Sequence, residues 1–560
     1  MFIKSITIKN FRGLDIDINS VNTLSTIIGK NDSGKTNICY ALLKTLDYRC
    51  RRIPFSISDS TNSNKEEIFI KVILDVNALN EEQLGTIGQF ISLNENKKEL
   101  IVQLVSKFNQ DTEEYEDTLT YGNPEGDCVE QKNNAQTGLD KILSIVYIGP
   151  LYDIKDSMSN YFSYKEKLNK ENDSKFGKNI SISINNLNEA IQSDSIVENM
   201  EKDINNNNEF NDLFENYQFK ILSKVKNENI YKSLNITPYI DEIEIEHIGD
   251  AKNKILSTIL KSKIVDKDKV QIFLVEEPEN HLYVLLQKMY IKSLLDLKPD
   301  QIIFTTHSPF TIDFEKINQI IKIVDCKKVH IFNKIKNEDF KKYGYLINIQ
   351  IAEMLYYDEV LLVEGNSEKY FYSYLMSKDE NFLKLLNKRR LGICSIDGIA
   401  FRNAKELLTN LGVKVFIKTD NDIFGVPKKN QNRYAGILRS LSYLSNEQKE
   451  ELLKKTRLTD EDFYFDKSLR VNTKVESNMQ CICDYFRNKG IFLSQHSEGF
   501  EKDFVDFLKL CGNDVDEVET ISYLKNAKLK NLHEFINEND FIVKVDDNSK
   551  KSILVNFLYE

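Results

Sequence analysis

The feature that most constrains this chain is a glycine-rich loop near its amino terminus. The alternating segment 24–28 predicts a strand before this loop, and the run 37–43 predicts a helix after it. In that context the loop cradles phosphate oxygens with its backbone amides, while its lysine reaches them and its hydroxyl completes a Mg²⁺ shell. The loop consists of Gly29, Lys30, Asn31, Asp32, Ser33, Gly34, Lys35 and Thr36 and fits G-x-x-x-x-G-K-[ST]. It predicts a fold of α/β class that binds ATP or another nucleoside triphosphate.

The second half of a nucleotide site is predicted much later in the chain. The apolar run 272–275 reads as a buried strand and ends in Glu276 and Glu277. We expect Glu276 to hold Mg²⁺ through water and Glu277 to polarise the attacking water. The alternative for this Glu-Glu-Pro is a helix start with its acids on the N-terminal dipole. His307 follows another strand and is predicted to sense the γ-phosphate.

A separate set of acids follows two later strands. Glu364 ends the apolar run 360–363, and Asp420 and Asp422 end the run 413–418. The carboxyl ends of parallel strands are where the active sites of open α/β sheets lie, and residues i and i+2 point to one side. Clustered carboxylates suit Mg²⁺ or Mn²⁺. Asp397 stands at an intermediate strand end and is a further candidate ligand, or else a turn residue before glycine.

Composition limits the kind of protein without naming its activity. Lys and Arg number 75 against 86 Asp and Glu, a net charge of −11, so indiscriminate coating of nucleic acid is excluded, although a local basic stripe is not. No run approaches eighteen apolar residues, which predicts no membrane span and a cytoplasmic protein. The eight cysteines show no C-x-x-C spacing and are expected to be free thiols.

The order of phosphate loop, acidic strand and T-T-H-S strand resembles the ATP-binding-cassette (ABC) ATPases of the structural-maintenance type. The opening N-F-R-G at 10–13 matches their first strand. That family completes its site across a dimer with a signature loop, whose counterpart here is 246–252. This segment keeps one glycine and lacks Leu-Ser-Gly-Gly. The departure makes nucleotide sensing with slow hydrolysis as plausible as a power stroke.

The Glu, then Asp-x-Asp, pattern resembles the Toprim fold of topoisomerases, primases and some nucleases. An ATPase of this type followed by Toprim resembles the overcoming-lysogenisation-defect (OLD) nucleases, and within them the Gabija-type anti-phage nucleases. The resemblance implies two-metal cleavage of double-stranded DNA by Glu364, Asp420 and Asp422. It also implies that Glu368 is a second acid near the metals. A late acid and a late lysine are implied too: Glu476 is the candidate acid, and Lys530 is chosen as catalytic from the competing Lys525, Lys528 and Lys530.

The predicted domain order follows from these matches. We expect an ABC ATPase-like domain in two halves, 1–150 and 241–345, interrupted by a mostly helical dimerisation insert at 151–240. A Toprim nuclease domain would fill 346–560. The expected partners are double-stranded DNA and further copies of the chain, as a dimer or tetramer. The Gabija resemblance adds a possible helicase-like protein.

Two other functions remain open from the sequence. An ATP-driven repair or recombination motor would use the Toprim site only as an accessory. A nucleotide-sensing protein would bind a partner and cut nothing. Cleavage that survives Glu277→Gln would argue against the motor, and the absence of nicked DNA with either metal would favour the sensor.

Overall fold

The computed structural model describes residues 1–91, 98–123, 128–131, 136–149, 268–312, 319–333, 349–396 and 401–559, with scattered positions between 182 and 258. Its contacts divide the chain into two units. The first is Met1–Arg12 with Thr36–Thr305, and the second is Gly13–Lys35 with Thr306–Glu560. Within the described residues, no helix is both long enough and apolar enough to cross a membrane.

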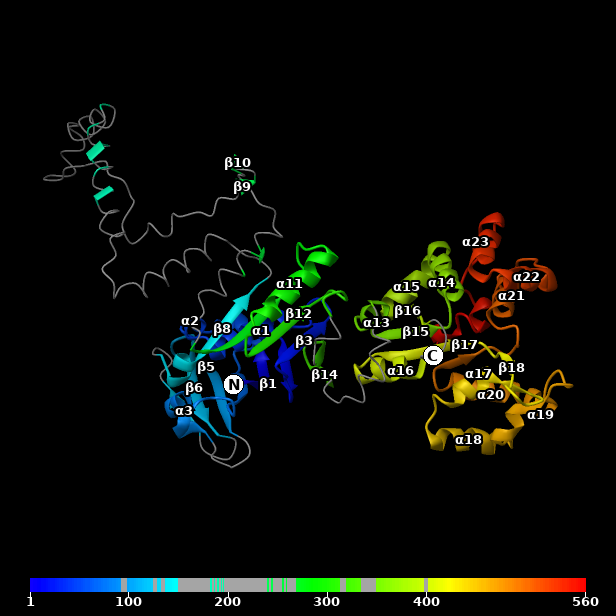
Figure 1. Ribbon diagram of the computed structural model, residues 1–560, viewed down its shortest axis with the longest axis horizontal. Helices are drawn as coiled ribbons and strands as arrows, with labels where there is room; N and C mark the ends of the chain where they lie inside the picture. The colour runs from blue at the N-terminus through cyan, green and yellow to red at the C-terminus, as the bar shows by residue number, and fades with distance from the viewer. Residues whose placement is uncertain are drawn as a thin grey trace. The chain divides into compact units, whose positions relative to one another are not determined.

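An antiparallel sheet forms much of the first unit, in blue and cyan in Figure 1. Its buried and partly exposed residues alternate along β4, as the sequence predicts for a sheet with one face on the core. Strands predicted at 3–9, 66–77 and 97–107 are confirmed here. In spatial order the strands are β1 (Phe2–Phe11), β4 (Ile68–Asp75), β5 (Glu99–Asn109), β6 (Glu114–Gly122) and β7 (Val129–Gln131).

The predicted acidic strand is the middle one of three parallel strands in the first unit. β11 (Val270–Glu276) lies between β8 (Leu143–Ile148) and β12 (Gln301–Thr306). All of β12, and all of β11 except Gln271, is buried, which explains their uninterrupted apolar sequences. The associated helices are α1 (Lys35–Leu46), α2 (Tyr48–Arg51), α3 (Glu81–Ile87), α4 (Gly138–Ile142) and α11 (Val284–Asp296).

The second unit begins with the strand that leads into the glycine-rich loop. β3 (Leu24–Gly29) runs parallel to β13 (Gln319–Val324), which pairs antiparallel with β14 (Lys328–Asn333). β2 (Leu14–Ile18) precedes β3. One hydrophobic cluster joins Ile28, Ile320 and Phe332 of these strands to later residues, including Leu355 and Val360. The phosphate-loop strand therefore shares a core with the carboxyl-terminal sheet.

That carboxyl-terminal sheet is fully parallel. In spatial order its strands are β16 (Leu391–Ser395), β15 (Glu359–Val363), β17 (Lys414–Thr419) and β21 (Ile491–Leu493). The helices around it are α13 (Ile349–Met354), α14 (Asn366–Lys378), α15 (Glu380–Arg389) and α16 (Phe401–Asn410). Because β15 and β17 are neighbours, the residues that follow them emerge at one edge of the sheet.

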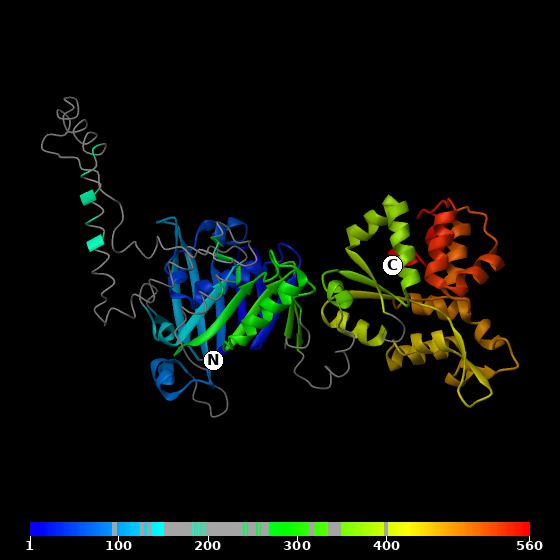
Figure 2. The same cartoon turned by 45° about the horizontal axis from the view of Figure 1, so that its top comes forward.

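Two groups of elements extend this sheet. A small antiparallel sheet, β18 (Ile423–Gly425), β19 (Gln431–Tyr434) and β20 (Tyr464–Asp466), stands with α17 (Ala435–Leu441), α18 (Asn446–Thr456), α19 (Thr473–Glu476) and α20 (Met479–Arg487). The last helices, α21 (Phe500–Leu510), α22 (Glu517–Asn526) and α23 (Lys528–Glu538), pack against one another in this order, and α23 lies beside α14 (Figure 2). Short 3₁₀ turns are at Ile57–Asp59, Thr61–Ser63, Gly88–Phe90, Asp460–Phe463, Ser549–Lys551 and Asn556–Tyr559.

Several predicted features fall outside the described residues. The insert at 151–240 lies almost wholly there, as do the signature-loop counterpart 246–252 and Asp397. The predicted domain boundaries therefore stay predictions.

Candidate nucleotide and acidic sites

The glycine-rich loop is closed over its own lysine. The ammonium of Lys35 donates to the carbonyl oxygens of Gly29, at 3.0 Å, and Lys30, at 2.7 Å, and its side chain is buried. Gly34 has φ +92, and a Cβ there would lie 2.4 Å from Leu14, so only glycine fits. The loop leads directly into α1, whose first amide groups favour an anion. The loop therefore stands at a helix amino terminus, and its role in binding phosphate stays a prediction.

The hydroxyl that ends the motif contacts the predicted magnesium acid. Thr36 Oγ1 donates a hydrogen bond to the carboxylate of Glu276, which is 2% exposed at the end of β11. Tyr147 donates to the other oxygen of this carboxylate. Burial, together with that acidic neighbour, raises the pKa of Tyr147 and keeps it a donor. The structure thus brings together two residues that are 240 positions apart.

Glu277 adopts a backbone conformation unusual for a residue with a side chain, with φ +43. Its amide donates to Thr305 at 2.9 Å, its carboxylate accepts from Asn280 at 2.6 Å, and its carbonyl accepts from buried Lys254 at 2.8 Å. Burial lowers the pKa of Lys254 to about 8. The alternative interpretation of Glu-Glu-Pro as a helix start is wrong, because no helix begins at Glu277. His307 directly follows β12 and is half-buried.

The later acids meet at the edge of the carboxyl-terminal sheet, as predicted. Glu364 Oε1 accepts the backbone amide of Asp420 at 2.9 Å and the hydroxyl of Thr419 at 2.5 Å. Burial and the charge of Asp420 raise the pKa of Glu364. Gly499, at φ +63, packs so closely that a Cβ would lie 2.5 Å from Asp420 Oδ2. Glu364 and Asp420 therefore form one compact site.

A buried lysine lies among these acids, a feature that the sequence analysis missed. Lys418 Nζ is 2.8 Å from Asp420 Oδ1, 3.0 Å from Asp503 Oδ2 and 3.5 Å from Glu368 Oε1, and its side chain is 1% exposed. Burial opposes ionisation, yet Lys418 lowers the pKa of Asp420, whereas burial raises that of Asp503. Asp420 is thus the principal partner of the ammonium. A lysine inside the apolar run 413–418 was the signal for it.

Glu368 and Asp503 are acids in helices rather than at strand ends. Glu368 lies in the first turn of α14 and accepts the amide of Gly365 at 2.9 Å. Its other oxygen, Oε1, is buried and has no hydrogen-bond partner in the structure, and burial raises the pKa of Glu368 to about 8. Asp503 is buried in the phenylalanine-rich helix α21. An acid between Phe500 and Phe504 was the sequence signal for Asp503.

Asp422 shares an arginine with Glu364. Arg439 Nη2 lies 3.0 Å from Asp422 Oδ2 and 3.0 Å from Glu364 Oε1, and it donates to the carbonyl of Asp420 at 3.2 Å. This arginine, in α17, is the second cation that the sequence analysis missed. Its apolar surroundings at 435–438 gave only a weak signal.

The remaining predicted residues are placed differently. Glu476 is exposed on α19, where Tyr434 donates to it at 2.9 Å, and no described contact joins it to the other acids. Lys530 pairs with Glu534 on α23 and is 75% exposed. Lys528 pairs with Glu501 at 2.9 Å, and although burial opposes it, Glu501 and the charges of Asp420 and Asp422 raise its pKa. Of the competing lysines, Lys528 is thus affected by the charges of Asp420 and Asp422, whereas the ion pair of Lys530 is with Glu534.

The acids have the chemistry for a divalent cation but not a finished coordination shell. Carboxylate oxygens are the ligands of Mg²⁺ and Mn²⁺, and Glu368 Oε1, which has no hydrogen bond and lies 3.5 Å from Lys418 Nζ, is a further candidate ligand. Within the described residues, no three acids, histidines or cysteines stand ready around one point. Arg439 and Lys418 already form ion pairs with these carboxylates. The residues fit a metal whose entry moves one of these cations.

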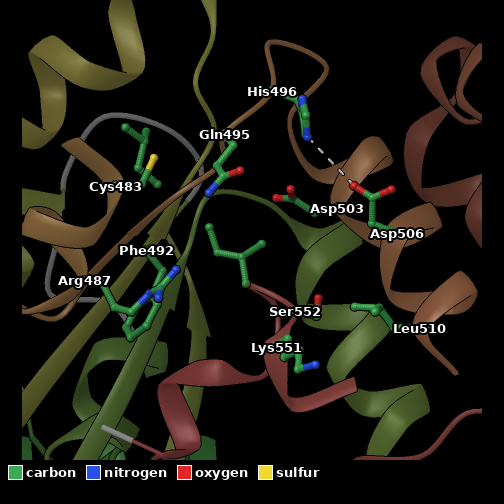
Figure 3. Close-up of a pocket in the computed structure, with 12 residues that line it drawn as sticks. Cys483, Arg487, Phe492, Gln495, His496, Asp503, Asp506, Leu510, Lys551 and Ser552 are labelled. Atoms are coloured by element: carbon green, nitrogen blue, oxygen red, sulfur yellow. Dashed lines mark ion pairs between the residues drawn. The ribbon is translucent and has the colours of Figure 1, made fainter. Parts of the chain in front are cut away.

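A cavity of about 200 Å³ has Asp503 in its lining (Figure 3). Asp503 lines it together with Asp506, His496 and Arg487. The ring of His496 is 4.0 Å from Asp506. Glu364, Asp420 and Asp422 do not line this cavity, so only Asp503 connects it with the acids.

The fold and the two sites define a nucleotide-binding ATPase joined to a Toprim-type acidic site. Residues 1–312 match the AAA ATPase domain family, and residues 355–422 match the overcoming lysogenization defect protein-like TOPRIM domain. The chain belongs to the AAA ATPase domain family and, with its Toprim domain, is an OLD-family endonuclease with an ATP-binding domain. The predicted order of an ATPase followed by Toprim is confirmed.

Named relatives agree with this assignment. The chain is 27% identical to Endonuclease GajA of Bacillus cereus (strain VD045), over 96% of this chain and 95% of that one. It is 21% identical to Old nuclease of Escherichia phage P2, over 75% and 77% of the two chains. The Smc head domain of Pyrococcus furiosus gives a TM-score of 0.33 at 15% identity, covering 61% of this chain and 99% of that one. A TM-score this low adds nothing to the assignment.

Proposed function

We propose that this chain is a divalent-metal-dependent DNA endonuclease whose Toprim site is controlled by nucleotide at the glycine-rich loop. The observation that carries the proposal is the meeting of Glu364, Asp420 and Asp422 at one sheet edge. Mg²⁺ or Mn²⁺ bound there would supply Lewis-acid stabilisation and a reactive water for phosphodiester hydrolysis. The similarity to Endonuclease GajA and Old nuclease supports DNA as the substrate.

Each acid and cation has a proposed role. Glu364, Asp420 and Asp422 would hold metal, and Glu368 would add its oxygen Oε1, which has no hydrogen bond, from α14. Asp503 is a stronger candidate than Glu476 for the late acid, because Asp503 touches the same lysine as Asp420. Lys528 then takes the part first given to Lys530, since a cation beside the acids can stabilise charge on the scissile phosphate.

At the nucleotide site the proposed ligand is ATP with Mg²⁺. Loop amides and Lys35 would contact the phosphates, and Thr36 and Glu276 would complete the metal shell. Glu277 and His307 keep their predicted roles in polarising water and sensing the γ-phosphate. The role of Glu277 is supported by the hydrogen bond that fixes its backbone, and the role of His307 by its position directly after β12.

Control of one site by the other is supported by contacts inside the second unit. Lys30 of the loop forms an ion pair of 2.5 Å with Asp358, the residue before β15, and Glu364 directly follows the far end of that strand. Ile28 packs in the same hydrophobic cluster as Val360. A nucleotide that moves Lys30 would therefore act on the strand that presents Glu364.

The biological setting is proposed from the relatives. We place the protein in the cytoplasm and in anti-phage defence, as the nuclease of a Gabija-type system. We also propose that it assembles as a dimer or tetramer and works with a helicase-like partner. The similarity over 96% of the chain to Endonuclease GajA supports the nuclease part of this proposal.

The test is a cleavage assay on supercoiled plasmid with Mg²⁺ or Mn²⁺ over a range of ATP concentrations. Wild type should nick or linearise the plasmid in a manner that varies with ATP, and Glu364→Ala should not. Glu447→Ala, which removes an exposed acid of α18, is the matched control and should cut like wild type. Cleavage that persists in Glu364→Ala would overturn the proposal, and so would no cleavage by wild type with the helicase-like partner supplied.

A further inference from the structure

Arg439 occupies an unusual position in the acidic site. Three oxygens, Glu364 Oε1, Asp422 Oδ2 and the carbonyl oxygen of Asp420, converge on its single nitrogen Nη2 at 3.0, 3.0 and 3.2 Å. Arginine usually meets a carboxylate through two parallel hydrogen bonds from two nitrogens. Here all three oxygens contact the same nitrogen, Nη2, and the buried Nε has no hydrogen-bond partner in the structure. Converging oxygens around one point are what a compact cation requires.

The backbone that carries Arg439 is fixed to the acids. The amide of Ala435, the first residue of α17, donates to the carbonyl of Asp422 at 2.8 Å. Gly436 packs so tightly that a Cβ there would lie 2.1 Å from the carbonyl oxygen of Asp420. The start of α17 therefore cannot move away from the Asp-x-Asp segment without a backbone change. Any exchange at Nη2 must come from rotation of the long arginine side chain.

The two cations of the site differ in their access to solvent. Lys418 is 1% exposed and has carboxylates on several sides, so it is a permanent part of the cluster. The side chain of Arg439 is 24% exposed and contacts Asp422, which is 30% exposed. Arg439 alone of the pair has a route into water. It can leave the carboxylates without unpacking the core.

We propose that Arg439 is an exchangeable counter-ion, a positioning residue that holds a metal position between Glu364 and Asp422 until a divalent cation takes its place. The displaced guanidinium then pairs with a phosphate of the DNA, because that is the anion brought to the same edge of the sheet. This inference rests on the proposed nuclease function. It assigns Arg439 two opposed effects: it competes with the metal, and it assists the substrate.

The decisive measurement is the affinity of the full-length protein for Mn²⁺ in the absence of DNA and nucleotide. Free Mn²⁺ is quantified by its electron paramagnetic resonance signal. Removing one charge-assisted contact predicts that Arg439→Gln binds Mn²⁺ about tenfold more tightly than wild type. At saturating Mn²⁺ the same variant should cut plasmid about tenfold more slowly, through loss of the phosphate contact. Arg439→Lys keeps the charge, so its Mn²⁺ affinity should stay within about threefold of wild type. A residue needed only for structure would not give tighter metal binding with slower cleavage.

Arg487→Gln is the matched control, because Arg487 is a partly exposed arginine of the same sheet region that pairs with Asp484. It should match wild type in both assays. Equal or weaker Mn²⁺ binding by Arg439→Gln would overturn the inference. If Arg439→Gln does not fold, Arg439→Lys is the test variant, and an Mn²⁺ affinity of Arg439→Lys far from that of wild type would overturn the inference. Failure of wild type itself to bind Mn²⁺ and to cut would instead reject the proposed function.

Discussion

The glycine-rich loop and the acidic site satisfy their charges in different ways. In the loop, Lys35 donates to two carbonyls, and Thr36 donates to Glu276, so neutral groups receive most of the hydrogen bonds. At the acidic site, carboxylates crowd together and two cations, Lys418 and Arg439, lie among them. The loop is built around hydrogen bonds, whereas the acidic site depends on counter-ions.

The difference shows how each site receives its ligand. A phosphate must take the ammonium of Lys35 from backbone carbonyls, which are weak competitors for a charged group. A metal at the acidic site must compete with ion pairs that already neutralise Glu364 and Asp422. Nucleotide binding should therefore depend little on the acidic site, while metal binding there should depend strongly on the resident cations.

The largest effect is expected from removing one acid, which tests whether cleavage depends on the acidic site while ATP binding does not. Asp422→Asn removes a charge from a 30% exposed position and leaves the buried Lys418 cluster intact. We expect cleavage to fall at least about 1,000-fold, because metal-ion stabilisation is worth several kcal/mol and each 1.4 kcal/mol is tenfold. ATP affinity, measured by calorimetry, should be unchanged. A parallel loss of ATP binding would show that the two sites are not separate.

The converse experiment is Lys35→Met at the loop. Loss of a charge-assisted contact to phosphate predicts ATP binding that is about 100-fold weaker. Binding of Mn²⁺ in the absence of nucleotide should remain at the wild-type level, since the carbonyls to which Lys35 donates, those of Gly29 and Lys30, belong to the loop. Calorimetry with ATP and paramagnetic resonance with Mn²⁺ measure the two affinities on one preparation. If Mn²⁺ binding also weakened, the contrast between the sites would fail.

The position of the loop between a strand and a helix could be predicted because its motif is contiguous in the sequence. A fixed spacing of glycine, lysine and threonine is enough to specify the turn, and the strand and helix on either side could be recognised from their periodicity. The meeting of Glu364 with Asp420 and Asp422 was also predictable, because parallel strands end at one edge. No similar rule connects Thr36 with Tyr147, which only the fold brings to the same carboxylate.

The parts that sequence reasoning missed come from helices far along the chain. Asp503 reaches the acids through the packing of α21, and Arg439 through a close backbone approach at Gly436. Such contacts depend on tertiary packing and leave no fixed spacing in the sequence. This is why Glu476 and Lys530, chosen from sequence alone, are placed outside the compact cluster.

The third prediction concerns Lys528 and tests whether a cation near the acids contributes to cleavage. Lys528→Gln should slow cleavage by up to about tenfold, because the charges of Asp420 and Asp422 act on its ammonium and a cation there can stabilise the scissile phosphate, an effect that its 57% exposure reduces. Lys530→Gln, two residues away and exposed, is the matched control and should change the rate less than about twofold. Single-turnover cleavage at saturating metal separates them. The reverse ranking would return the catalytic role to Lys530.

The smallest expected effect addresses the connection between the two sites. Lys30 and Asp358 form an ion pair whose side chains are 15% and 37% exposed, and such pairs contribute up to about 1 kcal/mol. Asp358→Asn should therefore change the response of cleavage to ATP by about fivefold or less, a figure set by that energy. Cleavage without ATP, and ATP affinity itself, should stay near the wild-type values. The measurement is the ratio of cleavage rates with and without ATP, with Asp460→Asn as control, because Asp460 forms a comparable ion pair with Lys449 on the surface. An unchanged ratio in Asp358→Asn would mean that the shared hydrophobic cluster, rather than this ion pair, carries the signal from the loop to β15.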